Sequence, residues 1–211
     1  MVLVHVSFIL TLFIFGAAIM CLEILSSSLM SPYFGGSIYI WGSIISSFMV
    51  NMALGYMLGG YISKHTRRAS ILMGMLMIGS IWVICIPTMY HPICTVVSAQ
   101  FQDVRLGSLI AMNSLFFLPI MIMSMISPYV IGLLSISRHY SGLRAGYVLF
   151  VSTFGAFIGT NITAFYLINM FEVSKIISGS GILCFFLSLT ILCMGIDRRI
   201  TLMTEQVSER R

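Results

Sequence analysis

Charged residues are scarce in this sequence of 211 residues, at 8% of the total, whereas soluble domains average about 25%. Hydrophobic residues make up 59%, and the mean hydropathy is +1.05. A chain with so few charges cannot cover a surface that faces water, which excludes a soluble globular domain. The lipid bilayer is therefore the expected solvent for most of the chain.

Acidic residues number only six, and the five cysteines show no Cys-x-x-Cys spacing. The sequence has no nucleophile–base constellation, no metal-ligand cluster and no glycine-rich cofactor loop followed by an acid. We therefore expect no enzymatic activity, no cofactor and no metal site. The net charge of +5 comes from short basic clusters between apolar runs, a pattern typical of membrane topology rather than of nucleic-acid binding.

Six apolar runs reach or approach the ~20 residues that a helix needs to cross a bilayer. They are residues 4–30, 38–62, 71–89, 106–136, 146–170 and 176–196. We expect an all-α membrane protein with six transmembrane helices in one domain, 1–196, followed by a basic tail, 197–211. Pro32 is expected to end the first helix, and Pro87 and Pro92 the third, which leaves a connector at 91–105.

Basic residues are distributed unevenly among the connections. Lys and Arg cluster after runs two, four and six, whereas only Arg105 and Lys175 follow runs one, three and five. Nine of the eleven basic residues thus lie on one side. The positive-inside rule then places both termini in the cytoplasm.

One tripeptide, Ser-Pro-Tyr, occurs twice, at 31–33 and at 127–129. We expect each copy to close a long helix. Gly55 follows Gly42 by thirteen positions, and Gly159 follows Gly146 by the same number. These matches predict two related units, at about 4–90 and 106–196. Because each unit has three spans, the second must be inverted in the membrane, as in many secondary transporters.

Two glycine pairs have the spacing that lets helices approach closely, Gly55 with Gly59 and Gly155 with Gly159. We expect all four glycines to pack helices together and to serve as sliding contacts if the helices rock.

Glu23 is the one acidic residue in the middle of an apolar run. An ionised side chain there costs roughly 2.5–3.5 kcal/mol on insertion scales, and no Lys or Arg lies at membrane depth to pair with it. Either the carboxyl group is protonated and hydrogen-bonded, or it faces a wet cavity and binds a cation or carries a proton. Pro119 holds the equivalent place in the second unit, eight residues before its Ser-Pro-Tyr.

The remaining candidate site residues surround these features. Ser27 lies one helical turn from Glu23 on the same face. Tyr33 and Trp41 fit either an interfacial aromatic belt or a cation–π gate for an amine. Asn51, Asn113 and Asn161 either contact a substrate or form hydrogen bonds between helices.

Several segments, taken in order, resemble the membrane portion of fused spermidine-synthase-like proteins. They are LEIL at 22–25, SPYFG at 31–35, WG at 41–42, ALGYMLGG at 53–60, LPIMIMSMISP at 118–128 and GAFIGT at 155–160. The resemblance covers about 16–167 and implies a multi-spanning domain of a bacterial inner membrane, linked to polyamine chemistry. The soluble aminopropyltransferase half of that family is absent from this sequence.

A second resemblance is to half of a major facilitator superfamily transporter, through the basic loop at 60–68. The usual aspartate of that motif is Ser63 here, and its second glycine is Thr66. The resemblance implies a parallel homodimer, which would restore twelve spans.

Two functions remain open at this point. The first is a secondary transporter for a small cationic, polyamine-like solute, with Glu23 in the pathway and protons as a candidate coupling ion. The alternative is a non-transporting membrane subunit that anchors or regulates a separate partner enzyme through its basic loops and tail.

Overall fold

The computed structural model describes residues 2–66, 68–134 and 141–194, and within these ranges the chain is helical without β-strands. The basic tail at 197–211 and residues 137–140 of a basic loop lie outside the described residues. Six helical stretches are long and apolar enough to cross a membrane, which confirms the number of predicted spans. They are Val6–Phe34, Ile38–His65, Ala69–Gln100, Val104–Leu133, Gly142–Met170 and Val173–Cys193.

Two of the spans are interrupted, so the helices outnumber the spans. The elements in chain order are α1 (Val2–Phe34), α2 (Ile38–His65), α3 (Ala69–Gln100), α4 (Val104–Ser124), α5 (Ile126–Leu134), α6 (Ser141–Ile162), the π-helical turn η2 (Thr163–Leu167), α7 (Ile168–Met170) and α8 (Val173–Cys193).

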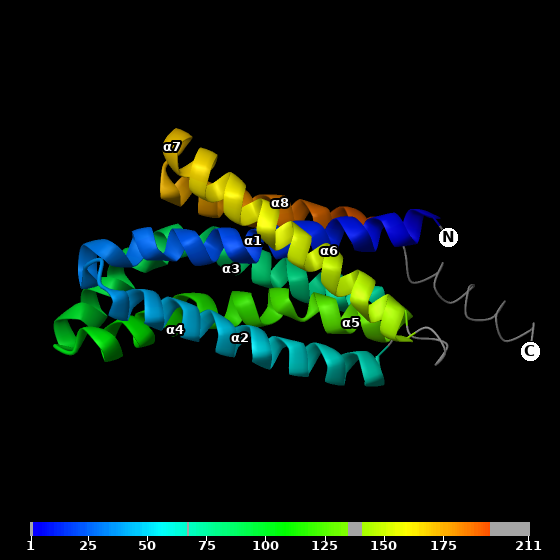
Figure 1. The fold of residues 1–211 in the computed structure, drawn as a ribbon, viewed down its shortest axis with the longest axis horizontal. Helices are drawn as coiled ribbons and strands as arrows, with labels where there is room; N and C mark the ends of the chain where they lie inside the picture. Colours follow the sequence, from blue (N-terminus) through cyan, green and yellow to red (C-terminus); the bar gives the residue numbers. More distant parts are fainter. Residues whose placement is uncertain (1, 67, 135–140, 195–211) are drawn as a thin grey trace, which may run out of the picture.

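The first span and the fourth span, α4 with α5, form the centre of the bundle. In the most apolar 18-residue stretch of these two spans, 56% and 61% of the residues are buried. The corresponding shares are 28% for the span that contains α6 and 33% for α8. α1 packs most closely along α6, α2 along α4 and α5, and α3 along α8 and α4. Figure 1 shows α6 crossing over α1, with α2, α4 and α5 below α1 in this view.

The first glycine pair joins α2 to the fourth span. A Cβ atom at Gly55 would collide with the backbone carbonyl of Met121, and one at Gly59 would lie 2.5 Å from that of Met125. The second contact lies four residues after the first in both α2 and the fourth span, so α2 and α4 run in the same direction. This i, i+4 ridge is typical of the close right-handed crossings that small residues permit.

The second glycine pair joins α6 to α1 in the same manner. A Cβ atom at Gly155 would collide with the carbonyl of Phe13, and one at Gly159 would lie 2.5 Å from that of Ala17. These helices also run parallel. Each glycine pair therefore packs on a helix from the other half of the chain.

The end of α1 differs from the prediction, because Pro32 lies inside the helix, which continues to Phe34. The helix ends at Gly35, which has a φ of +85° and donates its N–H to the Ser31 carbonyl at 2.9 Å. A glycine with positive φ commonly terminates helices in this way. The proline removes one hydrogen bond near the helix end without stopping the helix.

The prediction of a connector at 91–105 is also wrong. α3 passes through both Pro87 and Pro92 and ends at Gln100, so the connection is only three residues long. Inside a bundle, neighbouring helices and hydroxyl side chains satisfy the backbone groups that a proline frees, so an apolar helix continues past it. Asp103 then caps α4 by accepting a hydrogen bond from the Arg105 N–H at 2.9 Å.

Contrary to the prediction, the second Ser-Pro-Tyr does not close a helix. It lies in the first turn of α5, where proline is well tolerated. Tyr129 is buried; its hydroxyl donates to the Thr66 carbonyl at 2.6 Å and lies 2.8 Å from that of Arg68. It thereby ties α5 to the connection between α2 and α3. In the first copy Tyr33 instead meets the ring of His91 edge-on at 6.0 Å.

Pro119 lies inside α4, where its missing N–H leaves the Leu115 carbonyl without a helical donor. Trp82 of α3 supplies that donor, because its indole N–H donates to the Leu115 oxygen at 3.0 Å. The proline therefore weakens α4 locally and at the same time fixes it to α3.

This bond predicts unequal roles for the two tryptophans. Trp82→Phe should lower the free energy of unfolding by about 1–3 kcal/mol, because a buried carbonyl loses its donor. Trp41→Phe is the control, since Trp41 is 42% exposed, and it should change stability by no more than about 0.5 kcal/mol. Unfolding in detergent measures both variants, and equal effects would contradict the capping role of Trp82.

Candidate functional site

Glu23 lies on the central helix α1, eleven residues before Phe34, or about 16 Å along the axis at 1.5 Å per residue. Its side chain is half-buried. Within the described residues, no hydrogen bond or ion pair involves its carboxylate. The Ser26 hydroxyl donates to the backbone carbonyl of Glu23 at 2.6 Å and leaves the carboxylate unpaired.

A cavity of about 370 Å³ lies at the Phe34 end of α1, in the angle between α1 and α2. Two of the predicted site residues, Ser27 and Trp41, line it. Its remaining lining residues are Ser28, Ser31, Pro32, Gly35, Gly36 and Ile40. The Ser27 hydroxyl donates to the Ile24 carbonyl at 2.8 Å, so its oxygen can still accept a hydrogen bond.

Glu23 and Tyr33 do not line this cavity. Glu23 lies one turn of α1 beyond Ser27, farther from the Phe34 end of the helix. Tyr33 packs toward His91 of α3. The structure therefore brings Ser27 and Trp41 together, places Glu23 next to them along α1, and directs Tyr33 elsewhere.

The three predicted asparagines occupy three different environments. Asn113 of α4 donates to the Ser47 hydroxyl of α2 at 3.1 Å, which is the helix–helix bond considered from the sequence. Asn161 donates to the Phe157 carbonyl of its own helix at 2.7 Å. Asn51 is fully buried, and neither polar atom of its amide has a hydrogen-bond partner.

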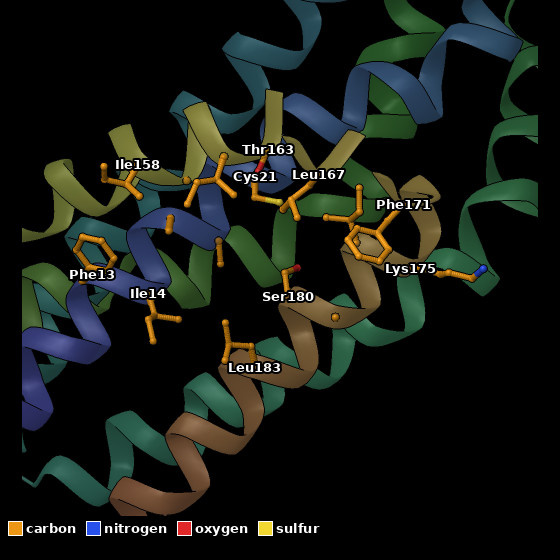
Figure 2. Close-up of a pocket in the computed structure, with 16 residues that line it drawn as sticks. Phe13, Ile14, Cys21, Ile158, Thr163, Leu167, Phe171, Lys175, Ser180 and Leu183 are labelled. Carbon is orange, nitrogen blue, oxygen red and sulfur yellow. The ribbon is translucent and has the colours of Figure 1, made fainter. Parts of the chain in front are cut away.

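A second cavity, of about 480 Å³, lies between α1, α6 with η2, and α8 (Figure 2). Its wall is almost wholly apolar, and Cys21 and Thr163 are among its few polar residues. Lys175 is at the rim, but it pairs with Glu172 at 3.5 Å and its side chain points away from the cavity in Figure 2. No polar motif in the sequence marks this cavity, so it could not be predicted from the sequence.

The π-helical turn η2 borders that cavity through Thr163 and Leu167. The Ile168 N–H donates to the Thr163 carbonyl, five residues back, which widens the helix locally. Such turns occur often at functional sites.

These features define an integral multi-pass membrane protein with six spanning helices, an unpaired acid in its central helix and a polar cavity one turn away. Comparison of the chain with protein-family models, with curated proteins and with solved structures found no match.

Proposed function

We propose that this protein is a secondary transporter for a small organic cation and that Glu23 is the carboxylate that binds the cation. The observation that carries the proposal is the unpaired, half-buried Glu23 on the central helix. A charge at membrane depth is expensive, so such residues typically mark ion or substrate paths. The amine class of the solute comes from the resemblance to polyamine-related membrane domains.

In this proposal the cavity beside Ser27 and Trp41 is the entrance to Glu23. Its serine hydroxyls accept hydrogen bonds from an ammonium group, and the Trp41 ring attracts a cation through its π face. The basic residues that follow the even-numbered spans favour a cytoplasmic location for both termini, by the positive-inside rule. The Gly35 turn and this entrance then face the outside of the cell, across a bacterial inner membrane.

We also propose that the two halves form an inverted repeat. The exchange of glycine contacts supports this arrangement, since each pair packs on the first span of the other half. The two contacts lie at different distances from the tripeptides, because Met125 lies two residues before the second Ser-Pro-Tyr whereas Ala17 lies fourteen residues before the first. Rocking of α2 on α4 and of α6 on α1 would alternately open the two sides.

The test is uptake into liposomes that contain the purified protein. A panel of radiolabelled mono-, di- and polyamines is offered with and without a pH gradient, and protein-free liposomes set the background. At least one amine should accumulate severalfold above background, and a proton-coupled carrier should respond to the gradient. If every amine remains at background in a folded preparation, the transport proposal fails and the anchoring-subunit alternative gains support.

A further inference from the structure

The face of α2 that meets the fourth span carries a small or polar residue at every fourth position. Ser43 accepts a hydrogen bond from Ser108 at 2.9 Å, and Ser47 accepts one from Asn113 at 3.1 Å. Further along, Gly55 lies against Met121 and Ser124 of α4. The remaining members of this row, which we call the α2–α4 seam, are Asn51, Gly59 and Ser63.

Asn51 lies between the Ser47–Asn113 bond and the Gly55–Met121 contact, so it faces the turn of α4 that contains Pro119. It is fully buried, and both its amide nitrogen and its amide oxygen lack a partner. They are the only such buried side-chain atoms among the described residues. Buried polar groups are almost always hydrogen-bonded, so the two unpaired atoms of this amide call for a polar partner at this position in the seam.

The chemistry of the amide restricts what this ligand can be. The NH₂ group needs an acceptor, and the oxygen needs a donor. A metal cation would satisfy only the oxygen, and an anion only the NH₂ group. A neutral group that both donates and accepts, such as water, a hydroxyl or an amide, satisfies both.

We propose that the α2–α4 seam at Asn51 is a binding site for a small neutral polar ligand, of which water is the smallest member. The ligand lies between the Ser47–Asn113 bond and the Gly55–Ser124 contact, and it bridges Asn51 to the turn of α4 at Pro119. The Ser47 hydroxyl accepts from Asn113 and therefore keeps its hydrogen for the same ligand. This site is independent of cation transport by Glu23.

The first test compares Asn51→Leu with Asn113→Leu, two near-isosteric changes on one seam. If a ligand pairs with the Asn51 amide, both variants lose hydrogen bonds, and each should lower Tm by about 2–4 °C or more. If the amide is unpaired in the folded protein, Asn51→Leu removes a buried unsatisfied group and raises Tm while Asn113→Leu lowers it. That second result overturns the proposal.

The second test uses wild-type protein and bound water as the probe. Brief X-ray exposure generates hydroxyl radicals from water held in the structure, and they oxidise the side chains beside it. Phe48 and Phe116 are fully buried, and their ring centroids lie 5.5 Å apart across the seam. They should be oxidised severalfold faster than Phe15, a fully buried phenylalanine of α1, and Asn51→Leu should abolish the difference. Equal, low rates at all three rings in wild type overturn the proposal, whatever the stability results.

Discussion

Replacing Glu23 by glutamine should abolish measurable uptake of the best amine substrate while the protein stays folded. A carboxylate and an ammonium group about 4 Å apart attract each other by about 4 kcal/mol at an effective dielectric constant near 20. Loss of that attraction weakens binding by roughly a thousandfold. Glutamine has nearly the same size and can still form hydrogen bonds, so the change isolates the charge. Uptake into liposomes, measured over a range of substrate concentrations, gives the loss directly.

Glu172→Gln is the matched control for this experiment. Glu172 precedes α8, is 65% exposed and, among the described residues, pairs only with Lys175, so its loss should leave uptake unchanged. Glu23→Asp retains the charge on a shorter side chain and should retain part of the activity. If Glu23→Gln transports as well as wild type, Glu23 does not bind the cation, even if the protein is a transporter.

Gly59→Leu should disrupt the bundle, whereas Gly60→Leu, one residue further along, should leave it intact. A Cβ at Gly59 would lie 2.5 Å from the Met125 carbonyl, 2.9 Å from the Met125 Cα and 3.0 Å from Pro128. Two of these neighbours are backbone atoms at the break between α4 and α5, and they cannot rotate away. A larger side chain must separate the helices, and we expect a loss of at least about 3 kcal/mol of stability.

The neighbouring Gly60 has nothing within 4 Å of the position that a Cβ would occupy. Leucine there adds helix propensity, so Gly60→Leu should be neutral or stabilising by up to about 1 kcal/mol. Thermal unfolding and the fraction of monodisperse protein in detergent distinguish the two variants. Equal behaviour would mean that α2 does not contact the fourth span through Gly59.

The number of spans could be predicted because hydrophobic length is a local property of the chain. A run of about 20 apolar residues has nowhere to go but the bilayer, whatever its neighbours are. Helix ends at proline could not be predicted by the same local rule. Pro32, Pro87 and Pro92 all lie inside helices, because packed neighbours and hydroxyl groups offset the lost hydrogen bonds.

Repetition in the sequence also had limited predictive value. The two Ser-Pro-Tyr copies are identical, but Tyr33 contacts a histidine ring whereas Tyr129 donates to the connection between α2 and α3. The helices that surround each copy are different, so the same side chain finds different partners. The Trp82 cap on Leu115 was missed for a similar reason, because it joins residues 33 positions apart.

The sequence by itself determined that the chain spans a membrane six times, that its glycine pairs are suited to close helix contacts, and that Glu23 is the one acid within a span. Only the tertiary structure decided which polar side chains are satisfied. The three asparagines are chemically identical, yet Asn113 bonds a neighbouring helix, Asn161 bonds its own helix, and Asn51 has no hydrogen-bond partner among the described residues. The difference arises because burial and partnership depend on which helix face meets which neighbour, and that choice depends on packing between segments far apart in the chain.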